Sequence, residues 1–365
     1  MSTPFWPRPP ERYAGTSPGA AEVIVIGGGI TGVSLLHHLQ RRGIQAVLVE
    51  RTHIAAGASG RNAGFLLAGV AENYAEAVRI FGREKAREVW HLTNENHDAM
   101  VEAVAGQKVG HRRLGSATLA SGPKEAEQLA ESAQLLNEDG FEAMWDGKRL
   151  INPDDGEINP AAMVGALARQ APPGAICEGV DVITVHSSPI GVHVLTERDE
   201  FSAEIVILAT NAYTAQIALA GPENAAEVLP PLVQPRRAQM LATAPIARPL
   251  CDLPTYSHFG YRYWRQLPAG EILIGGWRDT APEVEVGYDD QPTSRIQAHL
   301  EAQVEQLEAS AEITHRWAGT LGFTESGLPH VGPVEGVPNV YICAGYNGHG
   351  MGFAFMSAKQ LVNSL

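Results

Sequence analysis

The order of apolar and polar residues along the chain predicts strands and helices that alternate. The run 22–26 is almost wholly apolar, which is typical of a strand buried on both faces, and a glycine-rich turn follows it. An amphipathic helix is expected from about 30 to 42, and a second strand over 47–50. The same patterns predict strands at 111–120, 177–185, 193–196 and 204–208, and helices at 72–105, 123–138 and 159–170.

The pattern becomes all-β between about residues 231 and 286. Runs of β-branched, aromatic and apolar residues predict strands at 237–242, 260–265 and 271–275, with a turn at 268–270. An amphipathic helix at 294–309, a buried strand at 339–344, a glycine-rich loop at 345–352 and a final helix follow.

Composition and charge exclude several classes of function. A net charge of −14 argues against binding to nucleic acid or to an anionic membrane surface. No apolar run reaches the length of a transmembrane helix. The three cysteines, Cys177, Cys251 and Cys343, lack the spacing of a metal site, so we expect no metal. Together with the absence of a hydrophobic signal core near the N-terminus, they favour a cytoplasmic protein.

The glycine turn after the first strand has the spacing of a dinucleotide-binding motif. Gly27 allows a sharp turn, Gly29 leaves room for a pyrophosphate, and Gly32 allows the helix to pack closely on the sheet. Glu50, at the end of the second strand, can accept hydrogen bonds from the ribose hydroxyls. Because a carboxylate there would repel a 2′-phosphate, the motif favours FAD or NAD over NADP. A βαβ unit without a ligand remains the alternative.

The strand, glycine loop and helix that close the chain form a second place where backbone amides can face a ligand. We therefore predict an N-terminal arm over 1–20 that is disordered or draped on the surface, and two domains. A Rossmann-like, discontinuous domain is expected over 21–105, 155–230 and 310–365. A second, β-sheet-rich domain for the substrate is expected over 106–154 and 231–309.

Several separated blocks resemble the FAD-dependent amine and amino-acid oxidases, the family of the D-amino acid, glycine and sarcosine oxidases. The blocks are 27–32 with Glu50, 57–64, 180–182, 208–212, 275–276, 329–332 and 345–350. They span nearly the whole chain after residue 20. The second block and the C-terminal loop are most similar to the gamma-glutamylputrescine oxidase branch.

The resemblance implies a set of FAD-binding residues. In the order of the cofactor from pyrophosphate and ribose to flavin, they are Gly27, Gly29, Ile30, Thr31, Gly32, Glu50, Arg51, Val180, Ala209, Thr210, Ala58, Ser59, Arg61, Asn62, Ala63, Gly345, Gly348, His349, Gly350 and Met351. The backbone amides of the last group and the dipole of the final helix are suited to stabilise the negative charge of a reduced flavin. A helix cap or a packing residue is the alternative role for His349.

The sequence departs from the family at three functional positions. The position of the covalently linked cysteine of some sarcosine-type oxidases is Gly319, so we expect non-covalent FAD. The position of a lysine that assists the reaction with oxygen is Leu273, which leaves either O2 or another electron acceptor open. The two cations that hold a substrate carboxylate correspond to Leu67 and Gly352, so either the substrate is an amine without that carboxylate or another cation binds it.

The second domain offers replacements for those cations. Arg262 and Arg265 are the first candidates, among Tyr261, Tyr263 and Trp264, with Trp277 and Arg278 ranked below them. Arginine can hold a carboxylate through two parallel hydrogen bonds, and aromatic rings can hold an ammonium group. We therefore predict His349, Arg262 and Tyr263 as catalytic residues. The alternative for each residue of this strand is a structural role.

The resulting hypothesis is an FAD-dependent oxidoreductase for a small-molecule amine or amino acid. Hydride would pass from the carbon next to nitrogen to flavin N5, and the imine would hydrolyse. The alternatives are a flavin enzyme for another small substrate such as a hydroxy acid, an NAD-dependent dehydrogenase, and a non-catalytic flavoprotein.

Overall fold

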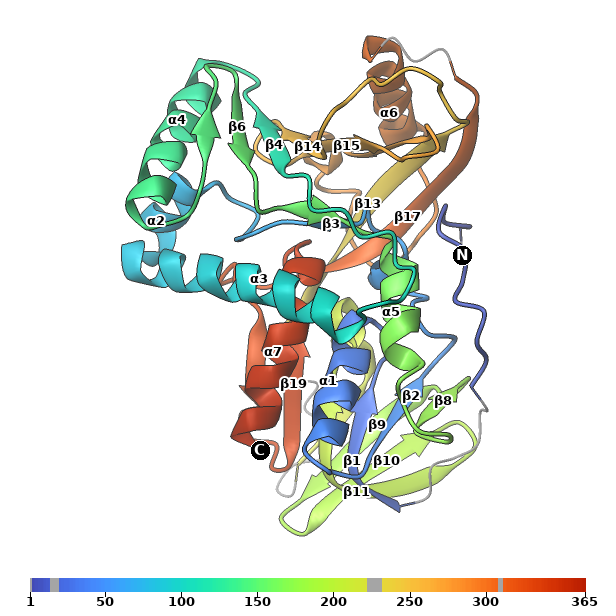
Figure 1. The fold of residues 1–365 in the computed structure, drawn as a ribbon. Coiled ribbons are helices and arrows are strands. Elements are labelled where there is room, and N and C mark those ends of the chain that lie inside the picture. The colour runs from blue at the N-terminus through green and yellow to red at the C-terminus, as the bar shows by residue number, and fades with distance from the viewer. Residues whose placement is uncertain (1, 14–19, 222–231, 308–310) are drawn as a thin grey trace.

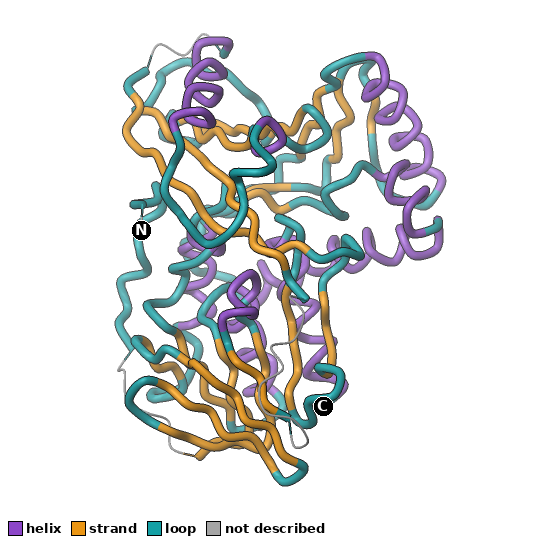
Figure 2. Tube along the Cα trace, turned by 180° about the vertical axis from the view of Figure 1, so that it is seen from behind, coloured by secondary structure: helices purple, strands orange, loops and turns teal. Residues whose placement is uncertain are grey.

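Two β-sheets organise the computed structural model, which describes residues 2–13, 20–221, 232–307 and 311–365 (Figure 1). The first sheet lies in the lower lobe of that view and the second in the upper lobe. Seen from behind, the strands again gather in these two lobes (Figure 2). The mixed α/β class predicted from the sequence is confirmed.

The first sheet has nine strands, and its centre is parallel. Its main path runs β12-β9-β10-β11-β1-β2-β8, and β19 pairs with β11 and with β18. Val25 of β1 lies opposite Leu48 of β2 and Ile207 of β11. The strands are β1 (Ala20–Ile26), β2 (Ala46–Glu50), β8 (Ile176–Glu178), β9 (Val182–Ser188), β10 (Gly191–Thr196), β11 (Glu200–Leu208), β12 (Ala218–Ala220), β18 (His330–Pro333) and β19 (Val340–Ala344).

Helices cover one face of this sheet. Helix α1 (Ile30–Arg41) packs beside α7 (Gly350–Ser364) and α5 (Pro160–Ala168), and α3 (Arg83–Ala103) crosses α7. The other short elements of this region are β3 (Phe65–Leu66), β7 (Gly156–Glu157) and the 3-10 turns η1 (Ala58–Gly60) and η2 (Asn211–Gln216). Because the strands β1, β11 and β19 are parallel, the turns that follow them meet at one edge of the sheet.

The second sheet has eight strands in the order β17-β13-β16-β15-β14-β4-β6-β5. They are β4 (Ser116–Leu119), β5 (Met144–Trp145), β6 (Arg149–Asn152), β13 (Gln234–Thr243), β14 (Thr255–Ser257), β15 (Arg262–Gln266), β16 (Ile272–Gly276) and β17 (Ile313–Phe323). Helix α6 (Ser294–Gln306) packs on β13 and β16, and α4 (Pro123–Glu138) packs on β6 and on α2 (Tyr74–Phe81). The 3-10 turn η3 (Arg278–Thr280) follows β16.

Four predicted segments differ from the structure for local or pairing reasons. The expected strand 177–185 is divided into β8 and β9 after Gly179, which has a φ of +77°. The expected helix 72–105 is divided into α2 and α3 by Gly82, whose φ of +84° cannot continue a helix. The expected strand 111–120 shortens to β4 because Gly115 has a φ of +88°. Strand β17 lies in the second sheet, paired along its length with β13, although the sequence placed residues 310–365 in the first domain. The expected domain boundary near 230 and the end of the helix 294–309 fall on residues outside those described.

Residues 2–13 of the N-terminal arm lie against both lobes. Trp6 is buried, and Arg8 forms an ion pair with Glu178 at 2.8 Å. No helix in the described part of the chain is long and apolar enough to cross a membrane. Over the same residues, His, Cys, Asp and Glu side chains form no group of three or more that would hold a metal ion.

Candidate cofactor and active site

A cavity of about 1160 Å³ lies between the two sheets, at the edge where the parallel strands end. Its walls include the turns after β1 and β11, the loop before α7, the loop 56–63 and residues of β13, β14 and β17. Ligand sites of open α/β sheets lie at this edge, because the loops and helix starts gather there.

The glycine turn forms a close-fitting cradle on the first wall. Gly27 has a φ of +112°, and a Cβ atom there would lie 2.7 Å from the carbonyl oxygen of Ala209. A Cβ on Gly32 would lie 1.8 Å from the carbonyl oxygen of Gly27, so α1 packs against the turn at a distance that only glycine permits. A Cβ on Gly29 would meet the Ser59 hydroxyl at 2.9 Å.

The start of α1 faces the cavity with its backbone amides. The cap residue Gly29 offers no side-chain acceptor, and the Ile30 N–H donates to the Ser59 hydroxyl at 2.9 Å. The positive end of this helix and its terminal N–H groups suit a phosphate.

Glu50 turns its carboxylate toward the same cradle. One oxygen accepts from the Gly28 N–H at 2.7 Å, and the other accepts from the Thr52 N–H at 2.8 Å. Glu50 lines the cavity together with Arg51, whose guanidinium lies 4.9 Å from the centre of the Tyr213 ring. A carboxylate in this place fits the hydroxyls of an unphosphorylated ribose.

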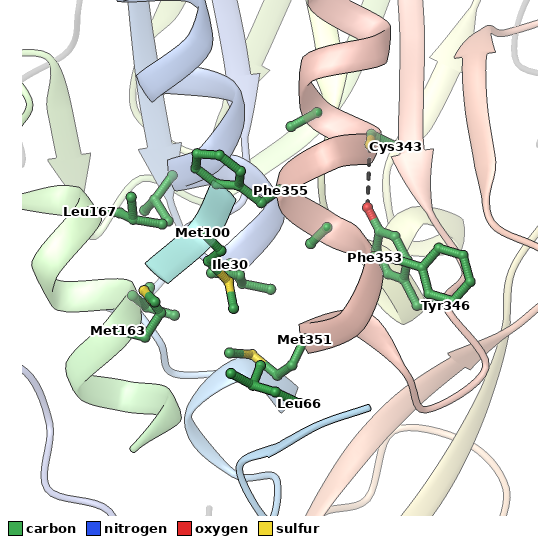
Figure 3. Close-up of a cluster of buried hydrophobic side chains, with 14 of the residues drawn as sticks. Ile30, Leu66, Met100, Met163, Leu167, Cys343, Tyr346, Met351, Phe353 and Phe355 are labelled. Atoms are coloured by element: carbon green, nitrogen blue, oxygen red, sulfur yellow. Dashed lines mark hydrogen bonds between the residues drawn. The ribbon is translucent and has the colours of Figure 1, made fainter. Parts of the chain in front are cut away.

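The second helix start lies beside the first. Gly345 and Gly348 have φ values of +86° and +90°, and α7 begins directly after His349, which caps it without a side-chain bond. The Tyr346 hydroxyl accepts from the Thr31 hydroxyl at 3.1 Å and lies 3.3 Å from the Cys343 sulfur, so the loop is tied to α1 (Figure 3).

The side chains beneath these two helix starts form a common apolar core. Figure 3 shows Ile30, Met351, Phe353 and Phe355 among buried residues of α3, α5 and the neighbouring loops. Cys343 belongs to this region, and burial raises the pKa of its thiol to about 12. None of the three cysteines lines the cavity, so no thiol is placed to bond a cofactor there.

The loop 58–63 crosses the floor of the cavity. The Asn62 side-chain amide donates to the carbonyls of Ala58 and Ser59 at 3.1 Å, and its oxygen accepts from the Gly64 N–H at 2.7 Å. The Arg61 guanidinium donates to the carbonyls of Ala56 and Ala318. The aliphatic part of the Arg61 side chain lies close to Gly319, since a Cβ on Gly319 would lie 3.3 Å from the Arg61 Cβ.

Aromatic side chains of both lobes form the upper wall. The ring of Tyr256 lies 5.3 Å from Phe65, 5.8 Å from Tyr263 and 6.2 Å from His349, measured between ring centres. Gly275 leaves the space that the Tyr263 ring occupies, because a Cβ there would lie 2.2 Å from that ring. Burial raises the pKa of Tyr263 to about 12, so its hydroxyl stays protonated at neutral pH.

His349 stands where this wall meets the start of α7. Burial lowers the pKa of its imidazole below the ordinary value, and the positive charge of Arg278 lowers it further. Its Nδ1 lies 3.4 Å from the Asn347 carbonyl oxygen. The imidazole is therefore neutral at physiological pH and can accept a proton.

The structure does not bring Arg262 to the cavity, which corrects its expected role. Residues alternate along β15, so Tyr261 and Tyr263 line the cavity while Arg262 points away from it. The Arg262 guanidinium pairs with both oxygens of Asp279 and stacks 4.6 Å from the Trp277 ring. Arg265 is also engaged, with Glu157 at 3.3 Å.

Arg278, which the sequence ranks below Arg262, does line the cavity. Trp277 adopts a left-handed φ of +62°, and the chain then turns so that Arg278 lines the cavity. Its guanidinium lies 4.7 Å from the centre of the Tyr261 ring and 4.6 Å from that of Phe323. Within the described residues no carboxylate forms an ion pair with it.

Sequence reasoning missed two buried polar groups on the cavity wall. The Asp155 carboxylate accepts from the Ala68 N–H at 2.8 Å and from the Ser116 hydroxyl at 2.6 Å. Thr320 on β17 is buried, and its hydroxyl has no hydrogen-bond partner among the residues described. No local pattern marks either residue, because each becomes a wall residue only through the pairing of distant strands.

Most of the residues predicted for the cofactor line this one cavity. They are Gly27, Gly29, Ile30, Thr31, Glu50, Arg51, Ala58, Ser59, Arg61, Asn62, Ala63, Val180, Ala209, Thr210, Gly348, His349, Gly350 and Met351. Gly32 and Gly345 do not line it and instead allow close packing next to it, and of the catalytic candidates His349 and Tyr263 line it.

These features fit a dinucleotide that reaches from Glu50 to the aromatic wall. The glycine cradle has no space for side chains, two helix starts face one cavity, and the Thr320 hydroxyl lacks a partner among the described residues. Fold and site together therefore fit a flavoprotein, in which the residues of both glycine loops would hold the cofactor.

The chain belongs to the FAD dependent oxidoreductase family (DAO), whose family model matches residues 22–364. It is 28% identical over 371 residues to the probable oxidoreductase OrdL of Rhizobium meliloti, covering 93% of this chain and 81% of that protein. It is 24% identical over 367 residues to the gamma-glutamylputrescine oxidoreductase of Escherichia coli (strain K12), covering 94% and 83%.

Among solved structures, glycine oxidase from Geobacillus kaustophilus has a TM-score of 0.78 at 19% identity, with 95% of each chain covered. At this identity the likeness concerns the fold. The comparisons confirm the predicted family, FAD as its cofactor and the oxidoreductase class.

Proposed function

We propose that this protein oxidises the C–N bond of a small amine or amino acid, with non-covalently bound FAD. The observation that carries the proposal is the aromatic wall of Phe65, Tyr256 and Tyr263, which meets a neutral His349 in the cavity that the FAD-binding residues line. The names of relatives, a gamma-glutamylputrescine oxidoreductase and a glycine oxidase, support this class of substrate.

The proposed reaction requires little acid–base catalysis from the protein. FAD, when bound, supplies the two-electron acceptor for the hydride of the carbon next to nitrogen. The aromatic wall holds the amine and excludes water from it. His349, neutral because burial lowers its pKa, is placed to take the proton that the ammonium form must lose.

Arg278 is the proposed anchor for a substrate carboxylate. Its planar faces are covered by Tyr261 and Phe323, which keeps the N–H groups on its edge available for hydrogen bonds. A carboxylate held there would share the cavity with Tyr263 and His349, because all three residues line it.

Substitution of Arg278 tests this anchor. Arg278→Gln should raise KM for amines that carry a carboxylate by about tenfold or more, because a charge-assisted hydrogen bond is lost. KM for amines of similar size without a carboxylate should change little. Arg198→Gln removes the same charge from an exposed residue outside the cavity and serves as the control. Equal effects of Arg278→Gln on both kinds of amine would remove Arg278 from this role.

A further inference from the structure

The N-terminal arm lies along the side of the cavity loop 58–63 that faces away from the cavity. Figures 1 and 2 show the N-terminal end at the junction of the two lobes, from where the trace runs along the outside of the molecule toward the first sheet. None of the described arm residues 2–13 lines the cavity itself. Any influence of the arm on a bound cofactor must therefore pass through the loop.

Two indole groups hold consecutive carbonyls of this loop. The Trp6 Nε1–H donates to the Asn62 carbonyl at 2.8 Å, and the Trp317 Nε1–H donates to the Arg61 carbonyl at 2.8 Å. Trp6 comes from the arm and Trp317 from β17 of the second sheet. Because both carbonyls are engaged, the peptide planes of a cavity-lining segment are fixed from its far side.

Ser2 connects the same loop to the second lobe. Its hydroxyl accepts from the Arg61 guanidinium at 3.2 Å and from the Ala318 N–H at 3.1 Å, and it donates to the Asp290 carbonyl at 2.7 Å. The Asp290 carboxylate lies 3.6 Å from the Arg61 guanidinium. Arg61, buried and lining the cavity, therefore depends on the arm for one of its hydrogen-bond partners.

The other end of the arm is fastened to the first lobe. Arg8 pairs with Glu178 at the end of β8, and the second oxygen of Glu178 accepts from the Ile54 N–H at 2.8 Å. Glu11 pairs with Arg169 after α5 at 3.0 Å. Since both ends are held, the segment between them keeps Trp6 in register with Asn62.

We propose that the arm is a positioning element for the cofactor: Trp6 and Ser2 fix the backbone of loop 58–63 and the guanidinium of Arg61 in the geometry that FAD requires. Loss of the Trp6 contact leaves the Asn62 carbonyl without its partner. Loss of the Ser2 hydroxyl removes a partner of the Arg61 guanidinium and of the Ala318 N–H. In either case the loop then relaxes away from that geometry. This inference concerns the cofactor and does not depend on the identity of the substrate.

A packing role without positioning is the alternative. Trp6 lies in an apolar cluster with Met240, Leu273 and Trp317, and the Arg265 guanidinium lies 5.2 Å from its ring. A variant that keeps the ring and removes only the N–H therefore separates the two roles. Trp6→Phe removes the donor, and Ser2→Ala removes the hydroxyl, while Ser2→Thr restores it.

The experiment titrates FAD into protein from which the cofactor has been removed, and measures Kd and the midpoint potential of the bound flavin. Trp6→Phe and Ser2→Ala should each raise Kd for FAD by about fivefold, the effect of losing one hydrogen bond, and shift the potential, while Ser2→Thr restores both. Arg12→Gln is the matched control, because Arg12 bonds only to carbonyls within the arm.

Circular dichroism and thermal unfolding establish that each variant is folded before the titration. A Kd and a potential that stay at the wild-type values in folded Trp6→Phe and Ser2→Ala would overturn the proposal and leave the arm a packing role. If Trp6→Phe does not fold, the comparison of Ser2→Ala with Ser2→Thr decides, since the two differ in the hydroxyl under test.

Discussion

Asp155 illustrates how one buried side chain gives the cavity wall its dependence on pH. Burial raises the pKa of its carboxyl group from the ordinary value of 3.8 to about 7, although the hydrogen bonds from Ser116 and Ala68 oppose the shift. In the folded protein the group therefore keeps its proton over a pH range where the unfolded chain has released it. Folding is stabilised by this group at low pH, and the contribution is lost as the pH rises through 7.

Replacement of Asp155 by Asn removes this titration. Asn cannot ionise, and its amide can keep both hydrogen bonds, so Asp155→Asn should gain stability relative to the wild type as the pH rises from 5 to 8. Between pH 5 and pH 7, the gain in unfolding free energy should approach about 1.4 kcal/mol for each pH unit, and above pH 7 it should level off. Urea unfolding at both pH values measures it. A difference in unfolding free energy that stays the same at pH 5 and pH 8 would show that Asp155 has an ordinary pKa.

At the scale of elements, the site depends on how closely α1 approaches the turn that precedes it. The α-carbon of Gly32 faces the carbonyl oxygen of Gly27 with no space for a side chain. Gly27 itself packs against the carbonyl of Ala209, directly after β11. This packing sets the direction of the helix and so the place of its amides. Stability and cofactor binding are therefore linked in this element.

Gly32→Ala should destabilise the protein by about 1–3 kcal/mol or more, because the added methyl group overlaps the backbone of the turn. The control is Gly57→Ala, at a cavity-lining residue with a φ of −80° and no atom within 4 Å of the added carbon. Chemical unfolding of the cofactor-free proteins compares the two. Equal stabilities for Gly32→Ala and Gly57→Ala would mean that α1 can shift without cost.

The same scale explains what the sequence could and could not predict. The glycine turn, β1, α1 and β2 were predictable, because their signals lie within one continuous stretch, and the family resemblance supplied most of the cavity-lining residues. The place of β17 was not predictable from its own residues, because it depends on pairing with β13, about 80 residues earlier in the chain. The sequence favours Arg262 over Arg278 because aromatic residues flank Arg262, and the left-handed turn at Trp277 leaves no recognisable pattern in the sequence.

For the whole molecule, the cavity between the two lobes brings the proposed cofactor site on the first sheet next to the proposed substrate wall on the second. The first lobe contributes two helix starts and Glu50, and the second contributes Tyr256, Tyr263 and Arg278. The N-terminal arm and the loop 58–63 bridge the two lobes. In the proposed function, a small substrate enclosed between the lobes would be brought against the cofactor and separated from water.

The measurement that tests the account most directly is the absorbance spectrum of the purified protein, before and after acid precipitation and after anaerobic addition of amines and amino acids. The account predicts flavin bands that pass wholly into the supernatant on precipitation and that are bleached by an amine or amino acid. Readmission of air then shows whether O2 accepts the electrons. A flavin that only a hydroxy acid bleaches would contradict C–N oxidation, and a colourless protein that takes up no added FAD would contradict the flavin site itself.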